Sequence, residues 1–142
     1  MEDDRDGWRQ LEDDTFVALL GPVRARDVED GVEIALEGGA HLRNLSGAMH
    51  GGVLMTLLDR AGGMAVRGAA AGSRVATASI AVSFLRPVRP EEPVTIRARL
   101  RKGGRSAHFV DAEAWAGGRL VATAQALYLR TGGDRRSNDL DD

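Results

Sequence analysis

The sequence of 142 residues predicts an α+β fold in which one long helix packs against an antiparallel sheet of about five or six strands. Three observations support this prediction. Apolar residues form a single long helical stripe over residues 53–67. From 75 to 130, hydrophobic and polar residues alternate with the period of two that is typical of strands. Glycine pairs at 103–104 and 117–118 join three of these strands by turns so short that neighbouring strands run antiparallel.

The N-terminal third has the patterns of a short helix followed by two strands. Apolar residues recur at helical spacing over 8–19, and Gly21-Pro22 ends this pattern. Residues 23–28 and 32–36 have the composition of strands, and the residues between them form a glycine-containing turn.

The central helix follows a glycine-rich stretch over 38–47, which we expect to be a loop. The helical stripe contains no proline and is long enough for a mostly buried helix, and it fades into a run of glycine and alanine over 68–72. The residues of the stripe are Leu54, Leu57, Leu58, Ala61, Met64 and Ala65.

The rest of the chain is predicted to form strands. The expected strands are 75–85, 94–101, 106–116 and 120–130. Along the first of them, strict alternation puts Ile80, Val82 and Phe84 on one face and Thr77 with Ser79 on the other. We therefore expect a single domain over 8–131, with charged, flexible tails at 1–7 and 132–142.

Composition excludes several classes of protein. Without cysteine, the chain cannot form a disulfide scaffold, a thiolate zinc site or a cysteine nucleophile, and its three histidines lack metal-ligand spacing, so we expect no metal. The first residues are acidic and lack a secretory signal, and no apolar run approaches the roughly 18 residues of a membrane span. We therefore expect a cytoplasmic protein that does not bind membranes.

The net charge of −2 hides a basic stretch over 86–105, where seven cationic residues stand against two acidic ones. This stretch is too small and too poor in aromatic residues to indicate a nucleic-acid-binding protein. It fits a small polyanionic ligand, or else the solvated face of a strand.

The residues with the clearest chemical potential surround the start of the central helix. Gly51 and Gly52 lie where the first backbone N–H groups of the helix have no partner within it. Because neither residue has a Cβ, a substrate carbonyl could approach these donors and the positive end of the helix dipole. The alternative is a glycine-rich loop that only leads into the helix.

Asp59 lies in the middle of this helix, on a face of small and moderately apolar residues. A carboxylate in such a setting can act as a general base or as a nucleophile. The alternative is a solvated side chain paired with Arg60 or Arg67. The residues that share its face are Gly52, Met55, Thr56, Gly62 and Gly63.

Asn44 and His50 complete this group. The amide of Asn44 can hold a water or a carboxylate, because it has both donors and an acceptor. His50, directly before the helix, can either anchor the loop or polarise a carbonyl group.

The spacing Asn44-x-x-Gly47-x-x-His50-Gly51-Gly52, followed by Asp59, resembles the hotdog-fold acyl-CoA thioesterases of the phenylacetate-pathway type. The resemblance extends over about 20–130, and further positions of the family pattern follow in the same order along the chain. These further positions are Thr77, Phe84-Leu85-Arg86-Pro87 and Gly104-Arg105-Ser106.

The resemblance implies a hotdog fold that pairs into a homodimer or homotetramer, with active sites between subunits. One chain would contribute Asn44, His50 and the Gly51 N–H, which polarises the thioester carbonyl of an acyl- or aryl-CoA. The other chain would contribute Asp59 as nucleophile or general base, with Thr77 as its polar helper. No cofactor is implied, since CoA is part of the substrate.

The resemblance also implies a binding surface for the substrate and its CoA portion. The residues that match it are Gly52, Phe84, Arg86, Arg89, Lys102, Gly104, Arg105 and Ser106. The chain departs from some relatives by having Asp59 in place of a glutamate and Gly63 in place of a hydroxyl residue. A non-catalytic acyl-CoA sensor and a dehydratase or hydratase of the same fold are the alternative functions.

Overall fold

The computed structural model describes residues 6–72 and 74–132 and contains one long helix and one seven-stranded sheet. The predicted tails, 1–7 and 132–142, lie almost entirely outside the described residues. The elements in chain order are β1 (Arg9–Gln10), η1 (Phe16–Leu20), β2 (Val23–Val28), β3 (Gly31–Leu36), η2 (Ala40–Leu42), α1 (Gly51–Ala69), β4 (Val75–Phe84), β5 (Val94–Gly103), β6 (Ala107–Ala116) and β7 (Arg119–Arg130).

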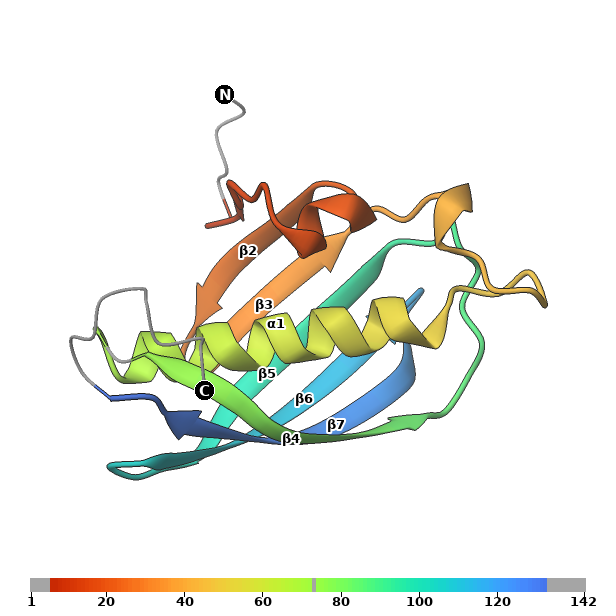
Figure 1. The fold of residues 1–142 in the computed structure, drawn as a ribbon. Coiled ribbons are helices and arrows are strands. Elements are labelled where there is room, and N and C mark those ends of the chain that lie inside the picture. Colours follow the sequence, from red (N-terminus) through yellow and green to blue (C-terminus); the bar gives the residue numbers. More distant parts are fainter. Residues whose placement is uncertain (1–5, 73, 133–142) are drawn as a thin grey trace.

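All neighbouring strands pair antiparallel, in the order β1-β2-β3-β5-β6-β7-β4. Figure 1 shows the sheet curving around α1, with β2 and β3 above the helix and β4 below it. The predicted α+β fold is therefore confirmed, as is the meander formed by β5, β6 and β7. The sheet has more strands than expected because the two-residue β1 adds to the edge of β2.

The core lies between α1 and the inner face of the sheet. The predicted apolar stripe is buried except for Met64, which is partly exposed, and Leu57, Leu58 and Val66 of α1 are among the least exposed side chains. The inward positions of β3 and β5 include Ile34 and Ile96, which lie opposite one another across the two strands. The alternation predicted for 94–101 is thus the pattern of a strand with one face covered by the helix. No helix within the described residues is long and apolar enough to cross a membrane.

The prediction of a helix over 8–19 is wrong. The indole ring of Trp8 lies beneath the guanidinium groups of Arg24 and Arg26, 5.4 and 4.7 Å from the ring centroid. The N–H of Leu11 donates to the carbonyl of Val23 at 2.9 Å. These contacts hold the chain extended beside β2, and only the five residues of η1 turn into a 3₁₀ helix.

Strict alternation along β4 is also wrong at its beginning. The pairing of β4 with β7 shifts between Thr77 and Ser79, so one extra residue bulges out of the ladder. Because of this shift, Thr77 lies on the same side as Ile80 and faces α1, where a regular strand would turn it away.

Candidate active site

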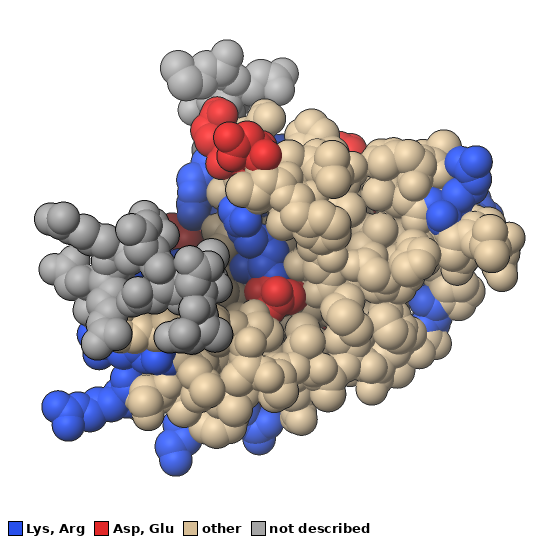
Figure 2. Space-filling view, viewed as in Figure 1, with Lys and Arg blue, Asp and Glu red and all other residues tan. Residues whose placement is uncertain are grey.

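An apolar cavity of about 710 Å³ runs along one face of α1, between η1 and β4. In Figure 1 these two elements flank the helix on opposite sides, and Figure 2 shows that uncharged residues cover most of this face of the molecule. Asp59 is the one carboxylate in the lining. The lining residues are Phe16, Val17, Leu20, His50, Gly52, Val53, Met55, Thr56, Asp59, Arg60, Thr77 and Ile80.

Two hydroxyl groups, from directly paired residues of the neighbouring strands β4 and β7, hold the carboxylate of Asp59. Oγ1 of Thr77, on β4, donates to Oδ1 of Asp59 at 2.7 Å. The hydroxyl of Tyr128, on β7, lies 3.1 Å from the same Oδ1 and donates at 2.8 Å to the main-chain oxygen of Asp59. Within the described residues, no hydrogen bond or ion pair engages Oδ2, and this oxygen is therefore available to a substrate or a water molecule.

Tyr128 is the part of this site that the sequence did not reveal. Its side chain is buried beneath α1, and a Cβ at position 62 would collide with its hydroxyl group, so Gly62 makes room for it. Burial raises the pKa of Tyr128, and the neighbouring charge of Asp59 raises it further. The phenol is consequently a hydrogen-bond donor throughout the neutral range. The adjacent Gly62 and Gly63 in a helix interior were the signal of a close approach.

His50 caps the helix. The Nδ1 atom of its ring accepts a hydrogen bond from the N–H of Gly52 at 2.8 Å, and the main-chain N–H of His50 donates to the carbonyl of Leu42 at 2.7 Å. The ring therefore caps the first turn of α1, and the backbone of His50 ties this turn to Leu42 of the preceding loop. An imidazole that accepts at Nδ1 carries its proton on Nε2. The N–H of Gly52 is already engaged, which leaves the N–H of Gly51 without a hydrogen bond among the described residues.

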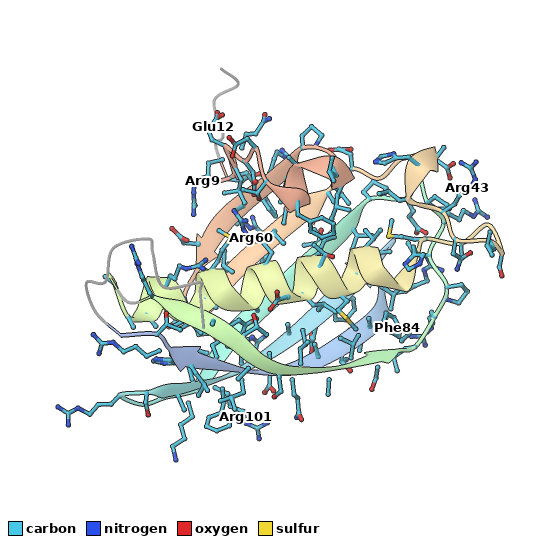
Figure 3. All side chains as sticks on the ribbon, in the orientation of Figure 1. Arg9, Glu12, Arg43, Arg60, Phe84 and Arg101 are labelled. Atoms are coloured by element: carbon cyan, nitrogen blue, oxygen red, sulfur yellow. The ribbon has the colours of Figure 1, made fainter. Side chains whose placement is uncertain are left out.

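Phe84 lies against Gly51 at this end of the helix. A Cβ on Gly51 would come within 3.2 Å of the Phe84 ring, and Figure 3 shows Phe84 at the end of β4 below the first turn of α1. The aromatic ring is about half exposed, at 52%. The half-exposed ring therefore lies beside the start of α1, where Gly51 is.

Asn44 holds its own loop. Its Oδ1 accepts from the backbone N–H groups of Ser46 and Ala48, at 2.8 and 3.1 Å, and its main-chain N–H donates to the carbonyl of Ala48 at 2.7 Å. Asn44 does not line the cavity that contains Asp59. The structure therefore gives Asn44 a turn-forming contact, and within one chain it does not bring Asn44 to the carboxylate.

Arg60, which lines the cavity, forms an ion pair with Asp13 of the segment before η1. Nη1 of Arg60 lies 2.9 Å from Oδ2 of Asp13, and Figure 3 shows Arg60 reaching from α1 towards the N-terminal segment. Hydrogen bonds from the side chain and N–H of Thr15 lower the pKa of Asp13, and Arg60 lowers it too. The carboxylate therefore stays ionised at neutral pH. Arg60 is engaged with Asp13, so the predicted alternative of an Asp59–Arg60 pair is not what the structure contains.

The expected CoA contacts form two groups rather than one. Arg86 and Arg89 follow β4, whereas the other group surrounds the turn between β5 and β6. The ten residues of β5 separate the two groups by about 30 Å. Within one chain the two groups therefore lie far apart. The residues of the second group are Lys102, Gly104, Arg105 and Ser106.

A second cavity, of about 820 Å³, lies beside the first group and is larger than the one at Asp59. Its lining has mixed charge: Arg89 lies there with Glu91, and Arg119 forms an ion pair with Glu92 at 2.7 Å. Neither Asp59 nor Thr77 lines it. We therefore locate the candidate active site in the smaller, apolar cavity. No cluster of three metal-ligating side chains occurs in the described part of the chain.

A family model of the thioesterase superfamily matches residues 46–123, which include all of α1 and β4. The chain belongs to this superfamily. Its match to the superfamily and the arrangement of helix and sheet together confirm the hotdog fold predicted from the sequence.

Individual relatives agree with this membership. An uncharacterized acyl-CoA thioester hydrolase of Zymomonas mobilis is 35% identical over 72 residues, which make up 51% of this chain and 48% of the relative. The chain spans about half the length of the curated relatives that it matches.

Two solved structures of similar size cover more of the chain. A conserved protein of Pseudomonas aeruginosa is 31% identical, with a TM-score of 0.76 over 82% of this chain and 93% of that one. A phenylacetic acid degradation-related protein of Ralstonia eutropha is 29% identical, with a TM-score of 0.75 over 84% of this chain and 92% of that one.

Proposed function

We propose that the protein hydrolyses the thioester bond of an acyl- or aryl-CoA to the free acid and CoA. The observation that carries this proposal is Asp59, a carboxylate held at one oxygen and open at the other, in a mostly apolar cavity. Membership of the thioesterase superfamily and the likeness to an acyl-CoA thioester hydrolase support it.

The open oxygen of Asp59 can serve the reaction in two ways. As a nucleophile, Oδ2 attacks the thioester carbon, the CoA thiolate leaves and takes a proton, and water hydrolyses the resulting mixed anhydride. As a general base, Oδ2 takes a proton from the water that attacks the thioester directly. Both routes consume one water and release one acid and one thiol. Mass spectrometry after rapid quenching distinguishes them, since only the first attaches the acyl group to Asp59.

The negative charge that develops on the thioester oxygen needs a hydrogen-bond donor. The N–H of Gly51 is open and lies at the positive end of the helix dipole. Asp59 of the same chain follows eight residues later, a distance of about 12 Å along the helix axis. This distance is too long for one carbonyl group to contact both. We therefore propose that each active site combines the Gly51 end of one chain with Asp59 of a second copy.

The sheet topology allows two copies to bring Gly51 of one chain close to Asp59 of the other. β4 ends the sheet, and its outer edge has no partner strand within the described residues. If two copies pair antiparallel along β4, the Phe84 end of one strand lies beside the Val75 end of the other. Because Gly51 packs on Phe84, and Thr77 near Val75 holds Asp59, this pairing brings the two halves of the site together.

The same antiparallel pairing would also bring together the two basic groups that lie far apart within one chain. Val75 pairs with Arg130 of β7, whose N–H donates to the carbonyl of Ser106 at 2.8 Å. The turn between β5 and β6 therefore lies at the Val75 end of β4. In an antiparallel dimer, Arg86 and Arg89 of one chain would approach Lys102 and the rest of that turn from the other. We propose that this joint surface binds the phosphates of CoA.

A substrate panel tests the activity. Acetyl-, hexanoyl-, palmitoyl- and phenylacetyl-CoA are offered to the protein, and the release of free thiol is measured. The apolar walls of the cavity predict that hexanoyl- or phenylacetyl-CoA is hydrolysed faster than acetyl-CoA. Binding of these compounds without any release of thiol would refute the proposal and favour an acyl-CoA sensor.

A further inference from the structure

We propose that Tyr128 is a positioning residue for the reaction, which together with Thr77 fixes Oδ1 of Asp59 so that Oδ2 alone faces the substrate. This inference rests on the proposed function, because it concerns how the carboxylate of Asp59 is presented.

The first argument is the convergence of two donors on one oxygen atom. Thr77 reaches Oδ1 from β4 and Tyr128 reaches it from β7, at 2.7 and 3.1 Å. The carboxylate cannot rotate to exchange its oxygens without breaking both contacts. A carboxylate with a single donor could still swing around that contact, so the second donor selects the oxygen that reacts.

The second argument is the way in which the phenol is built into the fold. Tyr128 is only 2% exposed, and its oxygen also lies 2.8 Å from the main-chain oxygen of Asp59. Tyr128 therefore contacts both the backbone of α1 and the side chain of Asp59. Gly62 leaves the space for this contact, because any Cβ there would displace the hydroxyl group.

The third argument is that the hydroxyl of Tyr128 keeps its proton and so remains a hydrogen-bond donor. Tyr128 has one proton, which its hydroxyl shares between the main-chain oxygen and Oδ1 of Asp59, at 2.8 and 3.1 Å. Burial and the charge of Asp59 both raise the pKa of Tyr128, so the phenol does not give up this proton at neutral pH. The hydroxyl is thus a permanent donor that solvent cannot replace.

The test is Tyr128→Phe, which removes the oxygen and retains the buried ring. We expect kcat to fall about 10- to 100-fold with KM within twofold of wild type, since the misplaced carboxylate affects the reaction and not the binding of substrate. In an Asp59→Asn background, the same change should cause no further loss of residual turnover, because no carboxylate remains to be positioned. A purely structural role would lower activity in both backgrounds.

Tyr128 is the only tyrosine in the sequence, and this permits a second measurement that does not need the phenylalanine variant to fold. The absorbance of tyrosinate in an alkaline titration reports on Tyr128 alone. In Asp59→Asn, we expect the ionisation at a lower pH than in wild type, because a neighbouring negative charge is removed. Identical titrations of two proteins that circular dichroism shows to be still folded would overturn the contact on which the proposal depends.

The outcomes separate this proposal from the function itself. If Asp59→Asn is inactive while Tyr128→Phe retains wild-type kcat, the positioning role is wrong and the thioesterase proposal stands. If Asp59→Asn retains full turnover, the proposed mechanism is wrong and the role of Tyr128 falls with it.

Discussion

Replacing Asp59 by asparagine tests the proposed mechanism most directly. The amide has nearly the shape of the carboxylate, and its oxygen can still accept from Thr77 and Tyr128, whereas its nitrogen cannot. The amide nitrogen therefore takes the place of Oδ2, and the open position loses both its charge and its ability to take a proton or attack carbon.

The size of the effect follows from these contacts. A general base contributes about 10²- to 10⁴-fold to kcat, which is about 3–5 kcal/mol of the activation barrier. The two hydrogen bonds become neutral rather than charge-assisted, and together they lose at most about 3 kcal/mol of stability. Turnover should therefore collapse while the protein still folds and binds substrate.

The assay compares thiol release under saturating acyl-CoA with the midpoint of thermal unfolding for both proteins. Thr56→Val is a matched control, because Thr56 lines the same cavity but its hydroxyl donates to the Gly52 carbonyl instead of to Asp59. Thr56→Val should retain most of the activity. If Asp59→Asn keeps more than half of the wild-type turnover, Asp59 is not the reacting group.

Three further predictions concern the oxyanion donor, the assembly and the CoA surface. Gly51→Val should lower kcat by about 10²- to 10³-fold, because its side chain would press on Phe84 and obstruct the N–H donor; unchanged activity in a folded variant would remove that role. Light scattering at micromolar concentration should give a mass at least twice the 15.1 kDa of one chain, and an active monomer would contradict a shared site. Arg105→Ala should raise KM for acyl-CoA severalfold, less so at high salt and not at all for an acyl-pantetheine thioester. Equal impairment with both substrates would instead indicate a structural role for the turn.

The sequence predicted the elements whose pattern is local. The apolar stripe of α1 and the alternation of β5 are each visible within about 15 residues, and the glycine turns define the meander that follows. What it missed depends on distant contacts. The helix expected near Trp8 was wrong because the indole stacks on arginines of the next strand.

In the candidate site, too, the residues with a local sequence signal were predicted and those that depend on distant contacts were not. Asp59 and the glycines at the start of α1 stood out because aspartate and glycine are unusual in these helical positions. Tyr128 did not stand out, because an aromatic residue in an alternating strand is usually part of the core. Its partner, Asp59, lies 69 residues away in the sequence. The inward turn of Thr77 depends on a one-residue shift of β4 against β7, which alternation alone does not reveal.

The separation of Gly51 from Asp59 along one helix has a consequence for mixtures of chains. A site divided between two copies can be rebuilt from two chains that are each inactive. A heterodimer of Asp59→Asn with Gly51→Val contains one site with both residues intact and one site with neither. Random pairing of equal amounts makes half of the dimers mixed, so about a quarter of the wild-type activity should return once subunits have exchanged. A site contained within a single chain would never be restored in this way.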